Sequence, residues 1–254
     1  MNNQSKVTLS GAGPFYFNGN DIGIIIIHGG GGGTCADLKP LGEDLHTQKK
    51  YTVHIPLLPG FGTSPEDLRI TPLSAWKRAL EKEIILIREK CEKIIVGGHS
   101  MGGVFSLILA SNINIDGVFT ISAPIGIRGF APKLVPLLKI FIKYYPIPLK
   151  KFKQETNGKW VGYDKIPLNI IGKFNKLMKE MKKALGAINC PALFFQGRLD
   201  SQIKKNSMDF IYEIVNSIVK KKIWLDHNDH PILCSPDHDE IVSTLINFID
   251  EVCN

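Results

Sequence analysis

The fold is decided by one stretch of sequence, Ile94-Ile95-Val96-Gly97-Gly98-His99-Ser100-Met101-Gly102-Gly103-Val104. It begins in an apolar strand, Lys93–Gly97, and runs into a short, nearly all-apolar helix, Met101–Asn112. A serine on a sharp strand-to-helix turn has a strained backbone, and the positions two away on either side must be small. The Gly-x-Ser-x-Gly pattern therefore predicts a nucleophile, Ser100, at a helix N-terminus, where backbone N–H groups face developing negative charge.

The rest of the chain repeats this alternation of strands and helices. Strands are predicted at Asp21–Ile27, Tyr51–Ile55, Gly117–Ser122, Ala192–Gln196 and Lys221–Leu225, and helices at Ala36–Lys49, Ser74–Cys91, Lys204–Val219 and Asp237–Cys253. Strands without polar alternation that are separated by helices are typical of a parallel sheet covered on both faces. We therefore predict an α/β fold with a mostly parallel central sheet flanked by helices.

The alternation stops between Pro124 and Ala187. Prolines interrupt apolar and lysine-rich stretches in this segment, and one helix is predicted at Leu168–Leu185. We expect residues 124–186 to form a helical cap inserted between two strands of a core made of residues 1–123 and 187–254. An insertion at the carboxyl edge of a sheet lies over the place where α/β folds bind ligands.

Positive charge is concentrated in one segment. The net charge is +7, but residues 128–183 alone hold 14 basic residues against three acidic ones. A solvated, lysine-rich surface is the simplest interpretation. A surface that attracts anionic lipid or acidic ligands is the sharper one, and apolar residues between 126 and 149 would suit transient contact with a lipid interface. No nucleic-acid-binding motif is present, so nucleic acid is not an expected partner.

Composition and cysteine usage predict a cytoplasmic protein. Hydrophobic residues make up 44% and charged residues 22% of the chain, as in soluble globular proteins. The longest aliphatic run, Ile24–Ile27, is far shorter than the ~20 apolar residues that span a bilayer. Residues Met1–Lys6 lack a secretion signal, and the five cysteines include no Cys-x-x-Cys pair, which favours free thiols.

A serine nucleophile needs a base and an orienting acid, which in this architecture follow in the order Ser, Asp or Glu, His. Asp200 lies in the loop past the strand Ala192–Gln196 and is the preferred acid. Asp226, at the end of the last strand, and Asp229, beside the candidate base, are its competitors.

His230 is the preferred base. It precedes the apolar residues Ile232 and Leu233, whereas His227 is expected to be an exposed loop residue and His238 a surface residue of the final helix. The spacing of the histidines and Cys234 matches no common zinc pattern, so neither a metal nor an organic cofactor is expected.

Five glycines, Gly29 to Gly33, follow Ile24–Ile27 and His28. The loop after this strand supplies an oxyanion-hole N–H in lipases and esterases. Gly31-x-Gly33-x-x-Ala36 also fits the dinucleotide fingerprint, but it begins three residues beyond the strand. No acidic residue occurs between Asp44 and Glu66 to hold a ribose, so this alternative is weak.

Taken together, these motifs resemble the α/β-hydrolase superfamily. More narrowly, the chain looks like the small bacterial monoacylglycerol lipases and carboxylesterases that carry a short helical cap. The resemblance rests on motifs spread over nearly the whole chain, namely His28-Gly29, Leu57–Leu68, Gly98–Gly103, Asp116-Gly117, Ile121–Pro124, Gln196–Asp200 and His230.

The resemblance implies a serine hydrolase that cleaves a small-molecule ester, a monoacylglycerol or a short-to-medium acyl ester, through an acyl-enzyme. It implies Ser100 as nucleophile, Asp200 as orienting acid and His230 as general base, with the N–H groups of Gly30 and Met101 as the oxyanion hole. A thioesterase or a serine peptidase on the same scaffold is the alternative.

The chain departs from the family pattern at two places. A glycine run stands where a larger residue usually follows His28-Gly29, which predicts a wider pocket and a more mobile loop. Asp229 replaces the usual small residue before the histidine, and its charge is expected to raise the basicity of His230.

Overall fold

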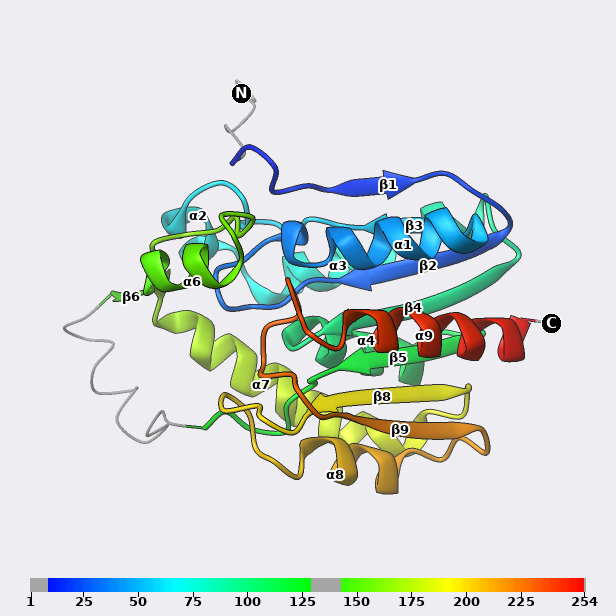
Figure 1. Ribbon diagram of the computed structural model, residues 1–254. Coiled ribbons are helices and arrows are strands. Elements are labelled where there is room, and N and C mark those ends of the chain that lie inside the picture. The colour runs from blue at the N-terminus through cyan, green and yellow to red at the C-terminus, as the bar shows by residue number, and fades with distance from the viewer. Residues whose placement is uncertain (1–8, 129–142, 254) are drawn as a thin grey trace.

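The computed structural model describes residues 9–128 and 143–253. They form a seven-stranded sheet in the order β1-β3-β2-β4-β5-β8-β9 (Figure 1). The parallel strands match the predicted runs: β2 (Ile22–Ile27), β3 (Thr52–Ile55), β4 (Lys93–His99), β5 (Gly117–Ile121), β8 (Ala192–Gly197) and β9 (Lys220–Leu225). A short strand that the sequence did not predict, β1 (Phe15–Phe17), pairs antiparallel with β3. The mostly parallel sheet is confirmed.

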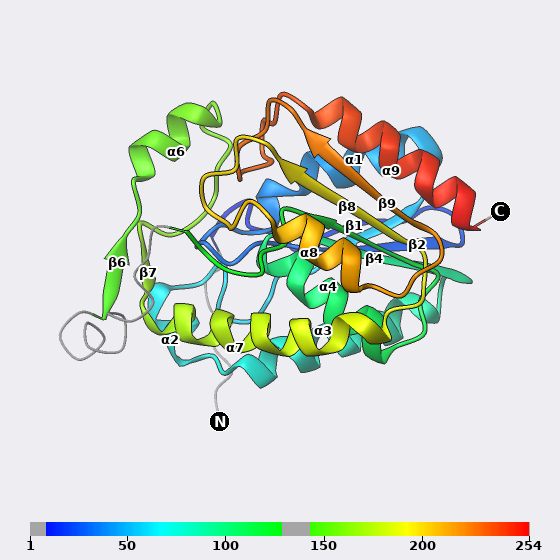
Figure 2. The ribbon, with the colours of Figure 1, turned by 90° about the horizontal axis from the view of Figure 1, so that it is seen from below.

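Helices cover both faces of the sheet (Figure 2). One face packs against α1 (Lys39–Lys49) and α9 (His238–Cys253), the other against α3 (Leu73–Arg88), α4 (Met101–Asn112) and α8 (Ser207–Ile214). Strand β2 shows why. Ile24 and Ile26 are fully buried in one core, and Ile25 and Ile27 in the other. Side chains alternate between the faces of a strand, so a wholly apolar strand needs cover on both.

The helix predicted at Lys204–Val219 is wrong at both ends, because α8 spans only Ser207–Ile214. At its start, the side-chain carbonyl of Gln196 accepts a hydrogen bond from the Met208 N–H over 2.9 Å. At its end, Val215 is extended, with ψ 128°. Contacts with the neighbouring strand thus override the local helical propensity.

Between β5 and β8 the chain leaves the sheet. The described part of this segment contains β6 (Tyr144–Pro146), α6 (Leu149–Glu155), β7 (Lys165–Pro167) and α7 (Asn169–Ala184), and β6 pairs antiparallel with β7. A short helix between β3 and α3, α2 (Pro65–Ile70), contacts β7. The buried residues of α7 share a core with α4, whereas α6 and β6 lie beyond the ends of the strands (Figures 1 and 2).

The division of the chain into a core and a cap at residues 124 and 186 stays a prediction. Residues 129–142, which hold most of the apolar stretch expected to meet a lipid interface, lie outside the described residues. Within the described ranges, none of the helices combines the length and apolar character needed to cross a bilayer.

Candidate active site

Ser100 lies on a tight turn between β4 and α4. Its φ of 54° and ψ of −117° fall in a region that residues with a Cβ rarely occupy. The turn is held against β5 because the Ser100 N–H donates to the Ile121 carbonyl over 2.8 Å. A Cβ on Gly98 or Gly102 would collide with the backbone of the facing segments, including the carbonyl of Ile27. The glycines are therefore needed because β2, β4 and α4 meet here with their backbones in contact.

Three side chains that are distant in sequence meet beside this turn. His230 Nε2 lies 3.0 Å from Ser100 Oγ, and His230 Nδ1 lies 2.9 Å from Asp200 Oδ2. All three residues are buried. A hydroxyl, an imidazole and a carboxylate in this order allow the hydroxyl proton to move to Nε2 while the carboxylate stabilises the charged ring.

The carboxylate of Asp200 is held in its charged form. Its Oδ1 accepts hydrogen bonds from the N–H groups of Gln202 and Ile203, over 3.0 and 3.2 Å. Burial raises the pKa of Asp200, but the hydrogen bond and charge of His230, together with the two N–H groups, outweigh burial and lower the pKa below its ordinary value. The group is thus ionised at neutral pH and orients the imidazole.

The competing acids contact other partners. Asp226 is exposed and forms an ion pair with Arg198. Asp229 Oδ1 accepts the N–H groups of His230 and Ser201, over 2.8 and 2.9 Å, so this carboxylate supports the loop rather than the ring of His230.

The other two candidate histidines, His227 and His238, contact carboxylates other than Asp200. The side chain of His227 is 77% exposed, as predicted, and contacts Asp237. His238 is only partly exposed, because its Nε2 lies 2.6 Å from Asp44 Oδ2. Among the described side chains, no three of the His, Cys, Asp and Glu residues are grouped as ligands for one metal ion.

The candidate oxyanion residues, Gly30 and Met101, are neighbours in space. A Cβ on Gly30 would lie 2.8 Å from Met101 Sδ, and both residues line the same cavity as Ser100. Met101 is the first residue of α4, where backbone N–H groups have no intrahelical acceptor. The backbone before Gly30 is positioned by His28.

His28 is a buried, neutral ring. Its Nε2 accepts the Leu58 N–H over 3.2 Å, so its proton is on Nδ1, which lies 2.8 Å from the Gly29 carbonyl. Burial lowers the pKa of His28 to about 4, and the hydrogen bond to Gly29 offsets this only in part. The ring thus connects the glycine loop to the segment after β3.

The glycine run packs against residues 161–163. The Tyr163 N–H donates to the Gly32 carbonyl over 3.0 Å, and Gly33 forms an isolated antiparallel bridge with Gly162. A Cβ on Gly162 would collide with the carbonyl of Gly32. The glycines therefore permit a close approach of two backbones, which the sequence did not predict. Greater mobility of this loop stays a prediction.

His99 was not among the predicted site residues. Its buried Nε2 donates to the His230 carbonyl over 2.8 Å, and the ring centroids of His99 and His230 are 4.9 Å apart. Burial, reinforced by the nearby charge of His230, lowers the pKa of His99 to about 3. His99 occupies the variable position of the Gly-x-Ser motif, so no sequence signal pointed to a partner in a distant loop.

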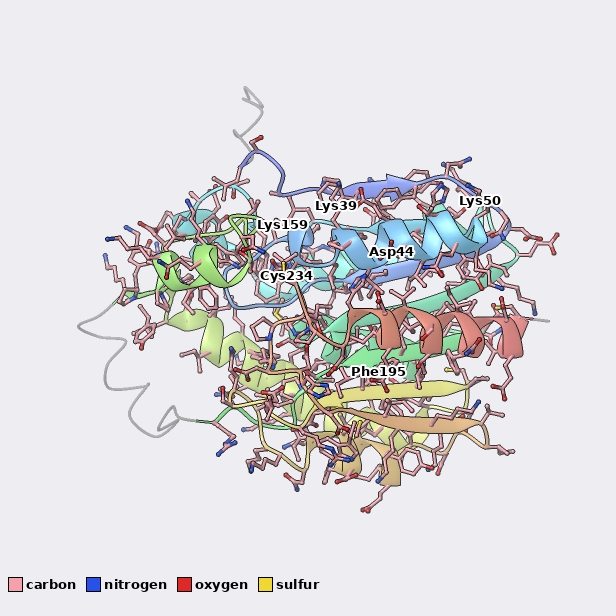
Figure 3. All side chains as sticks on the ribbon, viewed as in Figure 1. Lys39, Asp44, Lys50, Lys159, Phe195 and Cys234 are labelled. Carbon is pink, nitrogen blue, oxygen red and sulfur yellow. The ribbon has the colours of Figure 1, made fainter. Side chains whose placement is uncertain are left out.

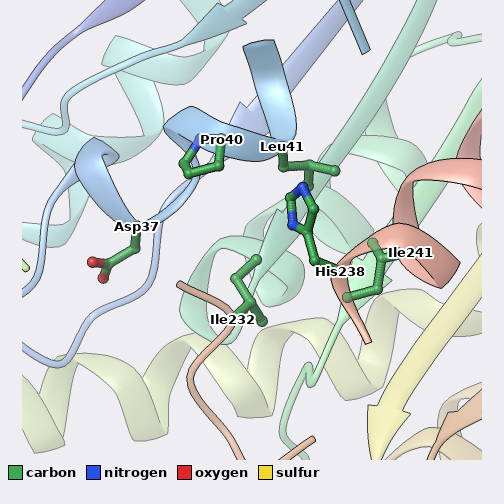
Figure 4. Close-up of a pocket in the computed structure, with 6 residues that line it drawn as sticks. All are labelled: Asp37, Pro40, Leu41, Ile232, His238 and Ile241. Atoms are coloured by element: carbon green, nitrogen blue, oxygen red, sulfur yellow. The ribbon is translucent and has the colours of Figure 1, made fainter. Parts of the chain in front are cut away.

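Asp37, in the 3-10 turn Cys35–Asp37, was also missed. Figure 4 shows its carboxylate turned away from Ile232 and His238. Its Oδ1 is buried and has no hydrogen-bond partner among the described residues, and burial raises the pKa of Asp37 to about 7. This carboxyl group lines the cavity that contains Ser100.

The cavity beside Ser100 has a volume of about 990 Å³, large enough for a small organic substrate. It lies at the end of the sheet marked by Cys234, which lines it, and far from Lys50 (Figure 3). One part of its wall is aromatic and is formed by Tyr145, Phe152 and Trp160. Another part is formed by α7 and the loops that contain residues 125–128 and 201–204.

Comparisons with known proteins agree with this geometry. The model of the family described as "Alpha/beta hydrolase family" matches residues 24–168. A thermostable monoacylglycerol lipase of Bacillus sp. (strain H-257) is 29% identical over 241 residues, which cover 94% of this chain and 95% of the lipase. A carboxylesterase of Bacillus subtilis (strain 168) is 29% identical over 244 residues, covering 94% of this chain and 96% of the esterase.

A solved structure from work on LipS and LipT, two metagenome-derived lipolytic enzymes, has the same fold. It superposes with a TM-score of 0.88 at 24% sequence identity, and the match covers 96% of this chain and 99% of that chain.

Proposed function

This chain belongs to the alpha/beta hydrolase family, and from that premise we propose that it is a serine hydrolase that cleaves carboxylic esters. One observation carries the proposal: His230 lies within hydrogen-bond distance of both Ser100 Oγ and Asp200. Two relatives that match nearly the whole chain, a monoacylglycerol lipase and a carboxylesterase, support ester hydrolysis as the reaction.

In the proposed mechanism, His230 Nε2 takes the proton of Ser100 as Oγ attacks the ester carbonyl carbon. The carbonyl oxygen becomes an oxyanion, which the N–H groups of Gly30 and Met101 stabilise. One such donor typically contributes about 10²–10³ in turnover. The protonated His230, stabilised by Asp200, then gives its proton to the leaving alcohol, and an acyl-Ser100 ester remains.

Water completes the cycle. His230, neutral again, takes a proton from a water molecule that attacks the acyl carbonyl. The second tetrahedral intermediate collapses, the carboxylic acid leaves, and Ser100 Oγ recovers its proton from His230. Besides the ester and water, both steps use only the side chains of Ser100, His230 and Asp200 and the backbone N–H groups of Gly30 and Met101.

For the substrate, we propose monoacylglycerols or short-to-medium acyl esters. The cavity volume of about 990 Å³ and its aromatic wall suit an acyl chain. The relatives' names support this choice. A panel of p-nitrophenyl esters, acyl-CoA thioesters and peptides tests it, because a thioesterase or a peptidase would prefer the second or third class.

Transient contact with a lipid interface belongs to the same proposal. It is supported by the excess of 14 basic over three acidic residues between 128 and 183, which favours anionic surfaces. Activity on monoacylglycerol should then rise on anionic micelles and fall with added salt.

A cytoplasmic location is likewise proposed, supported by five cysteines that are all free thiols.

Ser100→Ala tests the proposed nucleophile. This variant should lose p-nitrophenyl ester hydrolysis and labelling by a fluorophosphonate while its circular dichroism spectrum stays unchanged. Ser111→Ala, near the other end of α4, is the matched control and should keep full activity. Wild-type turnover by Ser100→Ala would exclude the proposed mechanism.

A further inference from the structure

Four basic side chains line one part of the cavity that contains Ser100. They are Arg128, Lys179, Lys182 and Lys204, and we refer to them as the basic rim. All four are exposed, and they come from three separate parts of the chain. The sequence placed three of them in the lysine-rich segment, but only the fold adds Lys204.

The periodicity of α7 brings two of these lysines to the cavity. Phe174, Met178 and Lys182 are spaced four residues apart and therefore lie on one face of the helix. Lys179, one residue after Met178, borders the same face, and all four residues line the cavity. Along α7, the wall of the cavity thus changes from apolar to cationic.

Two loops bring in the other basic residues. Ile127 and Ile203 form an antiparallel bridge, and the Lys204 N–H donates to the Gly126 carbonyl over 2.9 Å. A Cβ on Gly126 would lie 3.0 Å from Lys204 Cε, so the stem of this lysine passes directly over the glycine. The Arg128 N–H donates to the Gln202 carbonyl over 2.7 Å, which positions the backbone of Arg128 beside the same loop.

The charges of the basic rim are not neutralised by ion pairs with the carboxylates that the structure describes. Among the side chains that the structure describes, no Asp or Glu forms an ion pair with any of its four members. Lys182 Nζ instead lies 5.9 Å from the ring centroid of Phe210. Burial, and then the positive charge of Lys204, lowers the pKa of Lys182. An anion close to both lysines would relieve this repulsion.

We propose that the basic rim is a subsite for an anionic group, a carboxylate or a phosphate, carried by the ester substrate. The inference rests on the proposed function, because it assigns a substrate class to the cavity of Ser100. The anionic group can belong to the acyl chain or to the alcohol. In both cases the rim holds it while Oγ attacks the ester.

A simpler origin for the lysines of α7 is the helix dipole, which favours cations in the last turn. That effect applies equally to Lys183, which is in the last turn but does not line the cavity. Lys176 is also exposed on α7 and outside the cavity lining. The two interpretations can therefore be separated by variants with the same change in charge, Lys182→Gln/Lys204→Gln and Lys176→Gln/Lys183→Gln.

The first experiment compares charged and neutral esters of equal length. 4-Nitrophenyl hydrogen suberate carries a carboxylate at the end of its acyl chain, and 4-nitrophenyl octanoate does not. 1-Octanoyl glycerol 3-phosphate and 1-octanoyl glycerol make the same comparison for the alcohol. For at least one pair, the ratio of kcat/KM, charged over neutral, should fall about tenfold in Lys182→Gln/Lys204→Gln, which equals about 1.4 kcal/mol. The ratio should stay unchanged in Lys176→Gln/Lys183→Gln.

The second experiment measures binding without hydrolysis. The four ligands are titrated calorimetrically into Ser100→Ala, alone and combined with each pair of lysine substitutions. An anionic ligand should lose about tenfold in affinity only with Lys182→Gln/Lys204→Gln. If the wild-type protein hydrolysed none of the esters, the proposed function would be refuted. The difference in anion affinity between the two lysine variants would still test the subsite. Equal affinities of the anionic ligands for the two lysine variants would refute the subsite.

Discussion

His99 donates a hydrogen bond from its Nε2 to the backbone carbonyl of His230, over 2.8 Å. The residue before the proposed nucleophile thereby holds the loop that carries the proposed base. The distance between Ser100 Oγ and His230 Nε2 is 3.0 Å, and it depends on the relative position of these two segments. We therefore propose that His99 is a positioning residue, which acts on the reacting atoms through its hydrogen bond to His230.

Substitution of His99 tests this role. His99→Phe keeps an aromatic ring at this position but removes the donor, and a small displacement at a reacting centre can cost about 10²-fold in rate. We expect a fall in kcat of about ten- to a hundredfold with little change in KM. His99→Gln retains an N–H donor and should recover much of the rate. Equal kcat values for His99→Phe and His99→Gln would show that the hydrogen bond from His99 does not account for the fall in kcat.

Asp200→Asn should lower kcat by about 10⁴-fold, the effect of the equivalent change in a well-studied serine protease triad. The amide cannot hold Nδ1–H in the correct tautomer, and it does not stabilise the imidazolium. Asp226→Asn is the matched control, because Asp226 is exposed and its ion-pair partner among the described residues is Arg198. Steady-state kinetics on one p-nitrophenyl ester gives kcat for both variants. A larger fall in kcat for Asp226→Asn than for Asp200→Asn would show that Asp200 is not the orienting acid.

Asp37→Asn should stabilise the protein at alkaline pH. Burial raises the pKa of Asp37 to about 7, above the value of 3.8 for an unfolded chain, so the unfolded state releases this proton first as pH rises. The cost to stability therefore grows between pH 4 and 7 and is complete above pH 7. We expect a higher urea midpoint than wild type at pH 8 and a vanishing difference near pH 4. A lower midpoint at pH 8 would contradict the pKa argument.

Acid should destabilise the chain through two buried histidines. Burial lowers the pKa of His28 to about 4 and that of His99 to about 3, whereas the unfolded value is 6.5. The unfolded state therefore binds more protons as pH falls below 6.5, and stability is lost down to the folded pKa values. Asp37 has the opposite effect in this range. In the Asp37→Asn background, the urea midpoint should thus fall more steeply between pH 7 and 4 than in wild type.

Gly102→Ala should prevent folding or cost several kcal/mol, on the order of the largest effects of single substitutions. The added methyl group would collide with the carbonyl of Ile27, where α4 meets β2. A Cβ on Gly186 meets no atom within 4 Å, so Gly186→Ala is the control and should change stability by less than about 1 kcal/mol. Soluble yield and thermal midpoint are the measurements. Equal midpoints for the two variants would show that α4 can move away from the sheet.

Local sequence predicted the regular part of the fold well. An all-apolar strand such as Ile24–Ile27 is stable only between two layers of helices, and both layers are present. The helix at Lys204–Val219 was predicted too long, because Gln196 and the extended Val215 define its ends through tertiary contacts. Strand β1 was missed because a strand of three residues carries too little periodicity.

The sequence by itself determined the alternation of strands and helices and the strained turn at Ser100, since both follow from side-chain size and polarity over a few neighbouring residues. Tertiary structure alone decided which partners meet there. It brought Asp200 and His230 to Ser100, turned His99 toward a carbonyl 131 residues away, left Asp37 Oδ1 without a hydrogen-bond partner among the described residues, and added Lys204 to the basic rim. These features depend on segments that are far apart in the sequence. Separation along the chain does not indicate how close two segments lie in the folded protein.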